Sequence, residues 1–221
     1  MHRLLMTSAT YQMSSTYDAT ADRKDPENRW LWRWARQRLD AESFRDALLS
    51  LSGALDVTPH GSLLSVANRK YVTSTTNRSY DAYNSHRRSI YLPVVRSATY
   101  EPFQSFDFPD ASVLKGRRAV TTIPAQSLVL MNSQLVAQQT PRMAASLLAG
   151  SGDDNVRVRR AWDLVFSRPP TTAESERSRE FLKSYAQAAL EEKVPQAEAK
   201  QRAWQGLCRS LVSSNEFVYV E

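Results

Sequence analysis

Cysteine is almost absent from this sequence, and histidine is scarce. Cys208 is the only cysteine among 221 residues, so an internal disulfide, a CxxC metal knuckle and a CxxCH haem attachment site are all excluded. The three histidines, His2, His60 and His86, do not lie within one helical turn of each other and belong to no HExxH motif, which disfavours a zinc site. The sequence therefore predicts no metal and no other cofactor in this chain.

Long apolar runs are missing as well. No stretch approaches the roughly 18 apolar residues of a membrane span, so none is expected. The opening segment, MHRLLMTSATYQ, becomes polar too soon to contain the apolar region of a signal peptide. It is instead expected to be the last turns of a helix whose beginning is missing, which predicts that the chain is a fragment of a longer protein.

Lysine is scarce, whereas arginine supplies 23 of the 29 basic side chains. The formal net charge of +6 permits binding to nucleic acids, anionic glycans or membrane surfaces. A net positive charge also occurs on proteins in which it serves only solubility, so the charge alone does not identify a partner. The content of six glycines and ten prolines excludes collagen-like and low-complexity chains.

What the sequence does contain is a strong set of helix signals. In the N-terminal part, Asp25 is a good N-cap and Pro26 suits the first position of a helix. The tryptophan-rich segment 30–39 and residues 44–51 continue with apolar residues at helical spacing, and Gly53 is a natural stop. These signals predict a long helical stretch from Asp25 to Gly53.

The C-terminal part carries further helix signals. The last helix is expected to place its apolar side chains on one stripe, which predicts that Cys208 is a buried apolar residue and not a nucleophile. Helix starts are expected at Thr122 with Pro124, at Thr140–Pro141, at Asp153 or Asp154, and at the capping box Thr171–Glu174.

Between these helical parts, residues 57–120 lack a helical pattern and form a basic, irregular insertion. Within it, Ile90 to Val95 are β-formers interrupted by Pro93, which predicts an edge strand or a bulged strand because proline cannot donate to a ladder. The expected fold is mainly α, a single multi-helix domain. Its parts are a helical region at 1–56, the insertion with a small β-strand and loop content at 57–120, and a helical region at 121–221.

The insertion also contains the strongest candidate binding cluster, in which arginines and tyrosines are interleaved. Arginine forks bind carboxylates and phosphates, and tyrosine rings stack on bases or sugars. One interpretation is recognition of an external anion or glycan. The other is an internal network in which the arginines pair with acidic neighbours such as Glu101, Asp107 and Asp110. The candidate binding residues of this cluster are Arg87, Arg88, Tyr91, Arg96, Arg117 and Arg118.

Asp107 and Asp110, in the phrase FDFPD, are the best candidates for a pair of functional carboxylates. Pro109 fixes a turn that can aim both at a calcium ion or a sugar hydroxyl. Hydrolysis by such a pair would need one of them to be an acid with a raised pKa. The structural alternative is that both carboxylates accept hydrogen bonds from turn and cap amides.

Seven phrases occur in one order along the chain and resemble those of a single family. That family is the C-terminal domain of unknown function of large exported planctomycete-type proteins, which often carry a c-type cytochrome-like module and a second uncharacterised domain upstream. The phrases are HRLLMTSATYQMSS (2–15), DPENRWLWRWARQRLDAESFRDALL (25–49), RRSIYLPVVRS (87–97), FDFPD (106–110), GRRAVTTIPAQSLVLMNSQLV (116–136), SRPPTTAE (167–174) and SSNEFVYVE (213–221).

The resemblance implies a setting and not a mechanism. It implies an exported parent protein in the periplasm or cell envelope, haem in a separate module of that parent, and a link to polysaccharide use. It supplies no catalytic residues.

The function expected on these grounds is that of a non-catalytic accessory module. Such a module would bind the upstream domains of its parent protein or a polysaccharide, anionic or neutral. The alternative is a carbohydrate-degrading enzyme domain that uses Asp107 and Asp110. Nucleic-acid binding is less favoured, because the sequence has the charge but no helix-turn-helix, zinc or RNA-binding motif.

Overall fold

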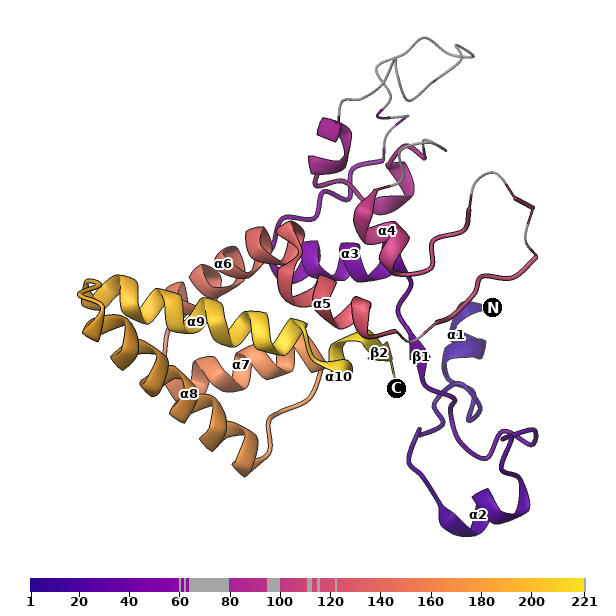
Figure 1. The fold of residues 1–221 in the computed structure, drawn as a ribbon. Helices are drawn as coiled ribbons and strands as arrows, with labels where there is room; N and C mark the ends of the chain where they lie inside the picture. Colours follow the sequence, from indigo (N-terminus) through magenta and orange to yellow (C-terminus); the bar gives the residue numbers. More distant parts are fainter. Residues whose placement is uncertain are drawn as a thin grey trace. The chain divides into compact units, whose positions relative to one another are not determined.

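The computed structural model describes residues 1–59, 61, 63, 80–94, 100–110, 113–114, 116–121 and 123–220. The chain divides into two compact units, one made of residues 1–39 with 219–221 and the other of residues 40–218. The predicted mainly helical class is confirmed, and within the described ranges the strands form only a small antiparallel pair (Figure 1).

The first unit consists of two short helices and this two-stranded sheet (Figure 1). Helices α1 and α2 span His2–Met6 and Ala19–Lys24. Strand β1, Gln37–Arg38, pairs with β2, Tyr219–Val220. The carboxylate of Asp18 caps α2 by accepting two backbone N–H groups of its first turn, which satisfies donors that a helix start leaves unpaired.

The helix predicted to begin at Asp25 is wrong for the tryptophan-rich segment. Asp25 follows the end of α2; its carboxylate accepts the backbone N–H of Trp30 at 2.7 Å, and its carbonyl oxygen accepts the indole N–H of Trp32 at 2.9 Å. Asn28 and Leu31 have φ angles of 52° and 54°, in the left-handed region that interrupts a right-handed helix. Local hydrogen bonds to side chains thus replace helical ones, and the segment folds as turns.

The second unit begins with helix α3, Ala41–Leu51, whose first turn is capped by the Asp40 carboxylate. A 3₁₀ helix, η1, follows at Tyr80–Asn84, and a second, η2, at Ser89–Tyr91. The short helix α4 spans Glu101–Ser105. The two 3₁₀ helices and α4 lie in the region in which the sequence predicted the irregular insertion.

The edge strand predicted at Ile90–Val95 is wrong where the structure describes it. The 3₁₀ helix η2 occupies its beginning, residues 92–94 belong to no strand, and Val95 lies outside the described residues. The backbone N–H of Ser89 donates to the Asp46 carboxylate of α3 at 2.8 Å. The residue just before the predicted strand is thus bonded to a helix side chain, and the small sheet lies in the first unit.

The remaining helices form a bundle in which α9 packs against both α6 and α8 (Figure 1). Of the two residues predicted as alternatives for the N-cap, Asp153 and Asp154, Asp153 caps α7, and the predicted capping box at Thr171–Glu174 is confirmed. None of the described helices is both long and apolar enough to cross a membrane. The bundle helices are α5 (Pro124–Asn132), α6 (Gln134–Ala149), α7 (Asp154–Phe166), α8 (Thr172–Glu191), α9 (Gln196–Val212) and α10 (Asn215–Val218).

The boundary between α5 and α6 falls at Ser133, and the helix start predicted at Thr140–Pro141 is wrong. Ser133 is extended, and its hydroxyl accepts the N–H of Val136 at 3.4 Å as an N-cap. Pro141 lies inside α6, where Thr140 is buried and its hydroxyl donates to the Val136 carbonyl at 2.9 Å. Burial of this face outweighs the local preference of proline for a helix start.

The core of the second unit joins α3 to the C-terminal helices. The Phe44 ring stacks on Phe106 with centroids 5.0 Å apart, and it meets Phe217 edge-on at 5.8 Å. On α9, Trp204 and Cys208 are buried, as predicted for Cys208. Burial also raises the pKa of the Cys208 thiol to about 12.

Candidate binding pocket

Two adjacent side chains of α3 hold the segment 85–89 in place. Arg45 is fully buried; its Nη1 donates to the Arg87 carbonyl at 2.8 Å and to the Ser89 hydroxyl at 3.2 Å, and its Nη2 donates to the Ser85 carbonyl. The Asp46 carboxylate accepts the backbone N–H of Ser89 at 2.8 Å and its hydroxyl at 2.6 Å. Together they fix this segment along α3.

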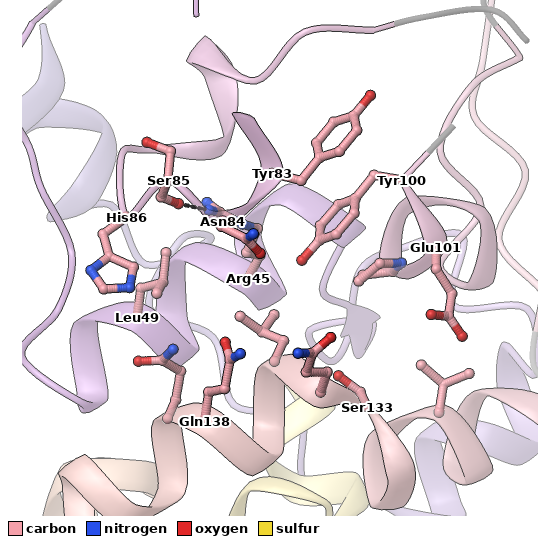
Figure 2. A pocket seen from close by; sticks show the side chains of 15 residues that line it. Arg45, Leu49, Tyr83, Asn84, Ser85, His86, Tyr100, Glu101, Ser133 and Gln138 are labelled. Carbon is pink, nitrogen blue, oxygen red and sulfur yellow. Dashed lines mark hydrogen bonds between the residues drawn. The ribbon is translucent and has the colours of Figure 1, made fainter. Parts of the chain in front are cut away.

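Beside this anchored segment lies a cavity of about 90 Å³, which is large enough for several water molecules. Residues of α3, η1, α4, α5 and α6 surround it, and all belong to the second unit (Figure 2). We call it the tyrosine pocket. Its lining residues are Arg45, Leu49, Tyr83, Asn84, Ser85, His86, Tyr100, Glu101, Pro102, Val129, Ser133, Gln134, Leu135, Gln138 and Gln139.

Two tyrosines form an aromatic wall of the tyrosine pocket. The rings of Tyr83 and Tyr100 are stacked, with centroids 4.8 Å apart and planes 7° apart. The Tyr83 hydroxyl donates to the Pro93 carbonyl at 3.1 Å, and Phe103 meets the Tyr100 ring edge-on at 5.3 Å. These contacts hold both rings in fixed positions.

Burial shifts the ionisation of two side chains in the pocket. It raises the pKa of Tyr100 above its usual value, an effect that the positive charge of Arg45 opposes. Burial also lowers the pKa of Arg45, which the Tyr100 hydroxyl and Asp46 oppose. In Figure 2 the Tyr100 hydroxyl points toward Arg45, so the two groups interact inside the pocket.

Most of the remaining lining is uncharged and capable of hydrogen bonding. Asn84 ends η1, His86 lies between η1 and η2, and the amide of Gln138 points from α6 into the pocket (Figure 2). Gln139 is buried, and its Oε1 accepts the Ser52 hydroxyl at 2.9 Å. The pocket therefore presents several donors and acceptors beside an aromatic wall.

Two of the arginines predicted as binding residues, Arg87 and Arg88, lie in the anchored segment. Arg87 is largely buried, with its Nε 3.7 Å from the Asp56 carboxylate. Arg88 is 57% exposed, with its Nε 3.9 Å from Asp46. Tyr91 is half-buried on η2, and Arg96 lies outside the described residues.

Arg118 is held by acidic residues at the start of α3. Its guanidinium donates to both oxygens of Glu42 at 2.7 and 2.6 Å and lies 3.5 Å from Asp40. The hydrogen bond to Glu42 raises the pKa of Arg118. Arg117 is exposed. Arg118 thus pairs with acidic residues of α3 and its cap, which are not among the acidic neighbours named in the sequence analysis.

Asp107 has a structural task in the turn after α4. It adopts a φ of 56°, and its carboxylate accepts the Thr121 N–H at 2.7 Å and the Thr121 hydroxyl at 2.8 Å. Asp110 is exposed. In the part of the chain that the structure describes, no three His, Cys, Asp or Glu side chains are grouped closely enough to hold a metal ion.

The sequence analysis missed the tyrosine pocket, although one signal for it was present. Arg45 occupies a position between Phe44 and Leu48 on the apolar face of α3, and Gln139 lies similarly beside Val136 on α6. A polar residue on a buried helix face needs partners, so such positions point to a polar cavity. Tyr83 is one of the tyrosines interleaved with arginines in the predicted binding cluster, whereas Tyr100 carried no signal.

Comparison with known proteins gives one match. Residues 1–182 match the model of a family described as PSD1, protein of unknown function (DUF1553). No curated protein and no solved structure matches the chain.

Proposed function

This chain belongs to the DUF1553 family, and we propose that it is a non-catalytic accessory module that binds a saccharide unit in the tyrosine pocket. The observation that supports this proposal is the lining of the pocket. Uncharged hydrogen-bonding side chains surround a fixed pair of stacked aromatic rings. Binding pockets of this kind combine a hydrophobic surface with a few placed polar groups.

The chemistry of a saccharide fits this combination. A sugar ring carries hydroxyl groups that both donate and accept hydrogen bonds, and C–H faces that are apolar. The amides of Asn84 and Gln138 and the imidazole of His86 each offer a donor and an acceptor. The stacked pair of Tyr83 and Tyr100 in the lining supplies apolar surface for the C–H groups.

The size and charge of the pocket restrict the ligand further. A cavity of about 90 Å³ suits part of one sugar unit and not an enclosed chain. Arg45 and Glu101 contribute one charge of each sign to the lining. We therefore propose a neutral terminal unit as the preferred ligand, with anionic saccharides as the comparison.

The proposed setting follows the family resemblance. The module would belong to an exported parent protein, act beside its upstream domains, and bring them to a polysaccharide. Any haem would be held by a separate module of that parent. The exposed Arg88 and Arg117 are proposed as contacts with an upstream domain or with the rest of the polysaccharide.

The test is a measurement of the melting temperature with neutral oligosaccharides, anionic oligosaccharides and short DNA. A ligand that binds only the folded protein raises the midpoint by mass action. We expect a neutral saccharide to raise it and the variant Gln138→Leu to lose the shift. Gln138 is exposed at the pocket edge, so its loss should leave the fold intact. The matched control is Gln201→Leu, an exposed glutamine on α9, which should keep the shift.

Two outcomes would overturn the proposal. One is that no saccharide raises the midpoint, or that Gln138→Leu responds like the unaltered chain. The other is release of new reducing ends from a polysaccharide, with loss of that activity in Asp107→Asn/Asp110→Asn. The second outcome would establish the enzymatic alternative.

A further inference from the structure

A second and larger cavity, of about 440 Å³, lies between α8, α9 and the start of α7. This volume falls within the range of roughly 300 to 1,000 Å³ that is common for small-molecule sites. We call it the α8–α9 groove. Its lining residues are Asp154, Asn155, Arg179, Leu182, Lys183, Ala186, Leu190, Gln196, Ala199, Lys200, Ala203 and Trp204.

The walls of the α8–α9 groove are largely apolar. Leu182, Ala203 and Trp204 line it and are buried, whereas Leu190, also in the lining, is 39% exposed. Alanine at 186, 199 and 203 leaves space that larger side chains would fill. An exposed apolar hollow of this kind is a favourable site for an apolar ligand.

The polar groups of the groove are predominantly cationic. Arg179, Lys183 and Lys200 oppose a single carboxylate, that of Asp154, so the lining carries a net charge of +2 from three cations and one anion. Asp154 is already paired with Lys200 and with Arg157, each at 3.0 Å. Within the described ranges, Arg179 and Lys183 form no ion pair.

We propose that the α8–α9 groove binds an amphiphilic monocarboxylate with a medium-length acyl chain. The chain would lie against Leu182, Leu190 and Trp204, and the carboxylate would lie between Arg179 and Lys183. Arg179 and Lys183 are one helical turn apart on the exposed face of α8, so both can reach one anion. The two cationic side chains therefore favour an anionic head group, and the apolar lining favours a hydrocarbon tail. This site is separate from the tyrosine pocket. Its lining is apolar and cationic, whereas the lining of the tyrosine pocket carries mostly uncharged polar groups.

The test is calorimetric titration of the intact chain with decanoate, below its micellar concentration. We expect saturable binding of one molecule per chain, and no binding of the cationic amphiphile decyltrimethylammonium. Lys183→Glu should weaken decanoate binding by about tenfold or more. The matched control is Arg177→Glu, an exposed charge reversal on the same helix outside the groove, which should leave binding unchanged.

A second variant tests the apolar part of the site independently. Ala186→Phe should fill the groove and abolish decanoate binding while the helical circular-dichroism signal is retained. The proposal is overturned if decanoate does not bind, if the cationic amphiphile binds equally well, or if Lys183→Glu binds like the unaltered chain. Saccharide binding to the tyrosine pocket should be unaffected by either variant, which separates the two proposals.

Discussion

The Arg168 guanidinium lies across the Glu216 carboxylate and donates hydrogen bonds of 2.6 and 2.8 Å to its two oxygens, although the two residues are 48 positions apart. The same guanidinium donates to both oxygens of Glu174 at 3.0 and 2.9 Å. It also lies over the Trp162 ring, 5.0 Å from its centroid. One side chain thus ties the α7–α8 connection to α10.

Replacing this arginine should destabilise the second unit. We expect Arg168→Ala to lower the free energy of unfolding by about 1 kcal/mol, because partly exposed ion pairs contribute modestly even when they form a network. Arg168→Lys should recover only part of this loss, because lysine cannot make forked hydrogen bonds to two carboxylates. Urea denaturation measures both values.

The control for this prediction is Arg159→Ala. Arg159 is 71% exposed and lies 3.9 Å from Asp163, so its removal should change the free energy of unfolding by less than about 0.5 kcal/mol. Equal losses for Arg159→Ala and Arg168→Ala would contradict the assigned role of Arg168.

The same cluster predicts a dependence of stability on pH. The hydrogen bond from Arg168 is the main cause that lowers the pKa of Glu174 to about 2, below its ordinary value of 4.5. A carboxyl with a lower pKa in the folded state contributes stability that is fully present above the unfolded-state pKa and is lost as the pH falls toward the folded-state value. The melting temperature should therefore fall more steeply below pH 4.5 in the unaltered chain than in Glu174→Gln. Parallel melting curves against pH would contradict this prediction.

Arg45 should be among the most sensitive residues of the second unit. Arg45→Ala removes the donors to the Ser85 and Arg87 carbonyls and leaves Asp46 without its buried partner. We expect a loss of about 3 kcal/mol in the free energy of unfolding, as for other broken buried pairs. Chemical denaturation measures it. The neighbouring exposed Arg88 supplies the control, because Arg88→Ala should cost no more than about 0.5 kcal/mol.

Cys208 should react with thiol reagents only when the protein unfolds. Burial both shields its sulfur and raises the pKa of the thiol to about 12, so very little thiolate is present near neutral pH. We expect no release of colour from Ellman's reagent with the native chain and one equivalent after addition of denaturant. Rapid reaction of the native chain would show that α9 opens readily.

The sequence predicted those features that depend on residues close together in the chain. The N-cap predicted at Asp153 or Asp154 and the capping box at Thr171–Glu174 need only neighbours within one turn; the structure has the first at Asp153 and confirms the second. The edge strand predicted at Ile90–Val95 is wrong; its beginning belongs to η2, whose first residue, Ser89, bonds to Arg45 and Asp46, more than 40 residues away. No local pattern of β-formers contains that information.

The candidate site was predictable to a smaller extent, for the same reason. Arg118 was recognised as a candidate, but its partners, Asp40 and Glu42, lie more than 70 residues earlier in the chain. The stacking of Tyr83 on Tyr100 depends on how α4 folds back toward η1. Such pairings follow from tertiary packing, which the spacing of residues in the sequence does not encode.

Arg45 and Asp46 hold segment 85–89 through groups of the segment other than the side chains that line the tyrosine pocket, so holding the segment and recognising a ligand fall to different groups. The hydrogen bonds that hold the segment involve backbone groups and the Ser89 side chain, whereas the side chains of Asn84 and His86 face the tyrosine pocket. A library randomised at Asn84 and His86 alone would therefore vary the recognition surface on a constant frame. The two positions are therefore suited to changing the ligand specificity of the pocket.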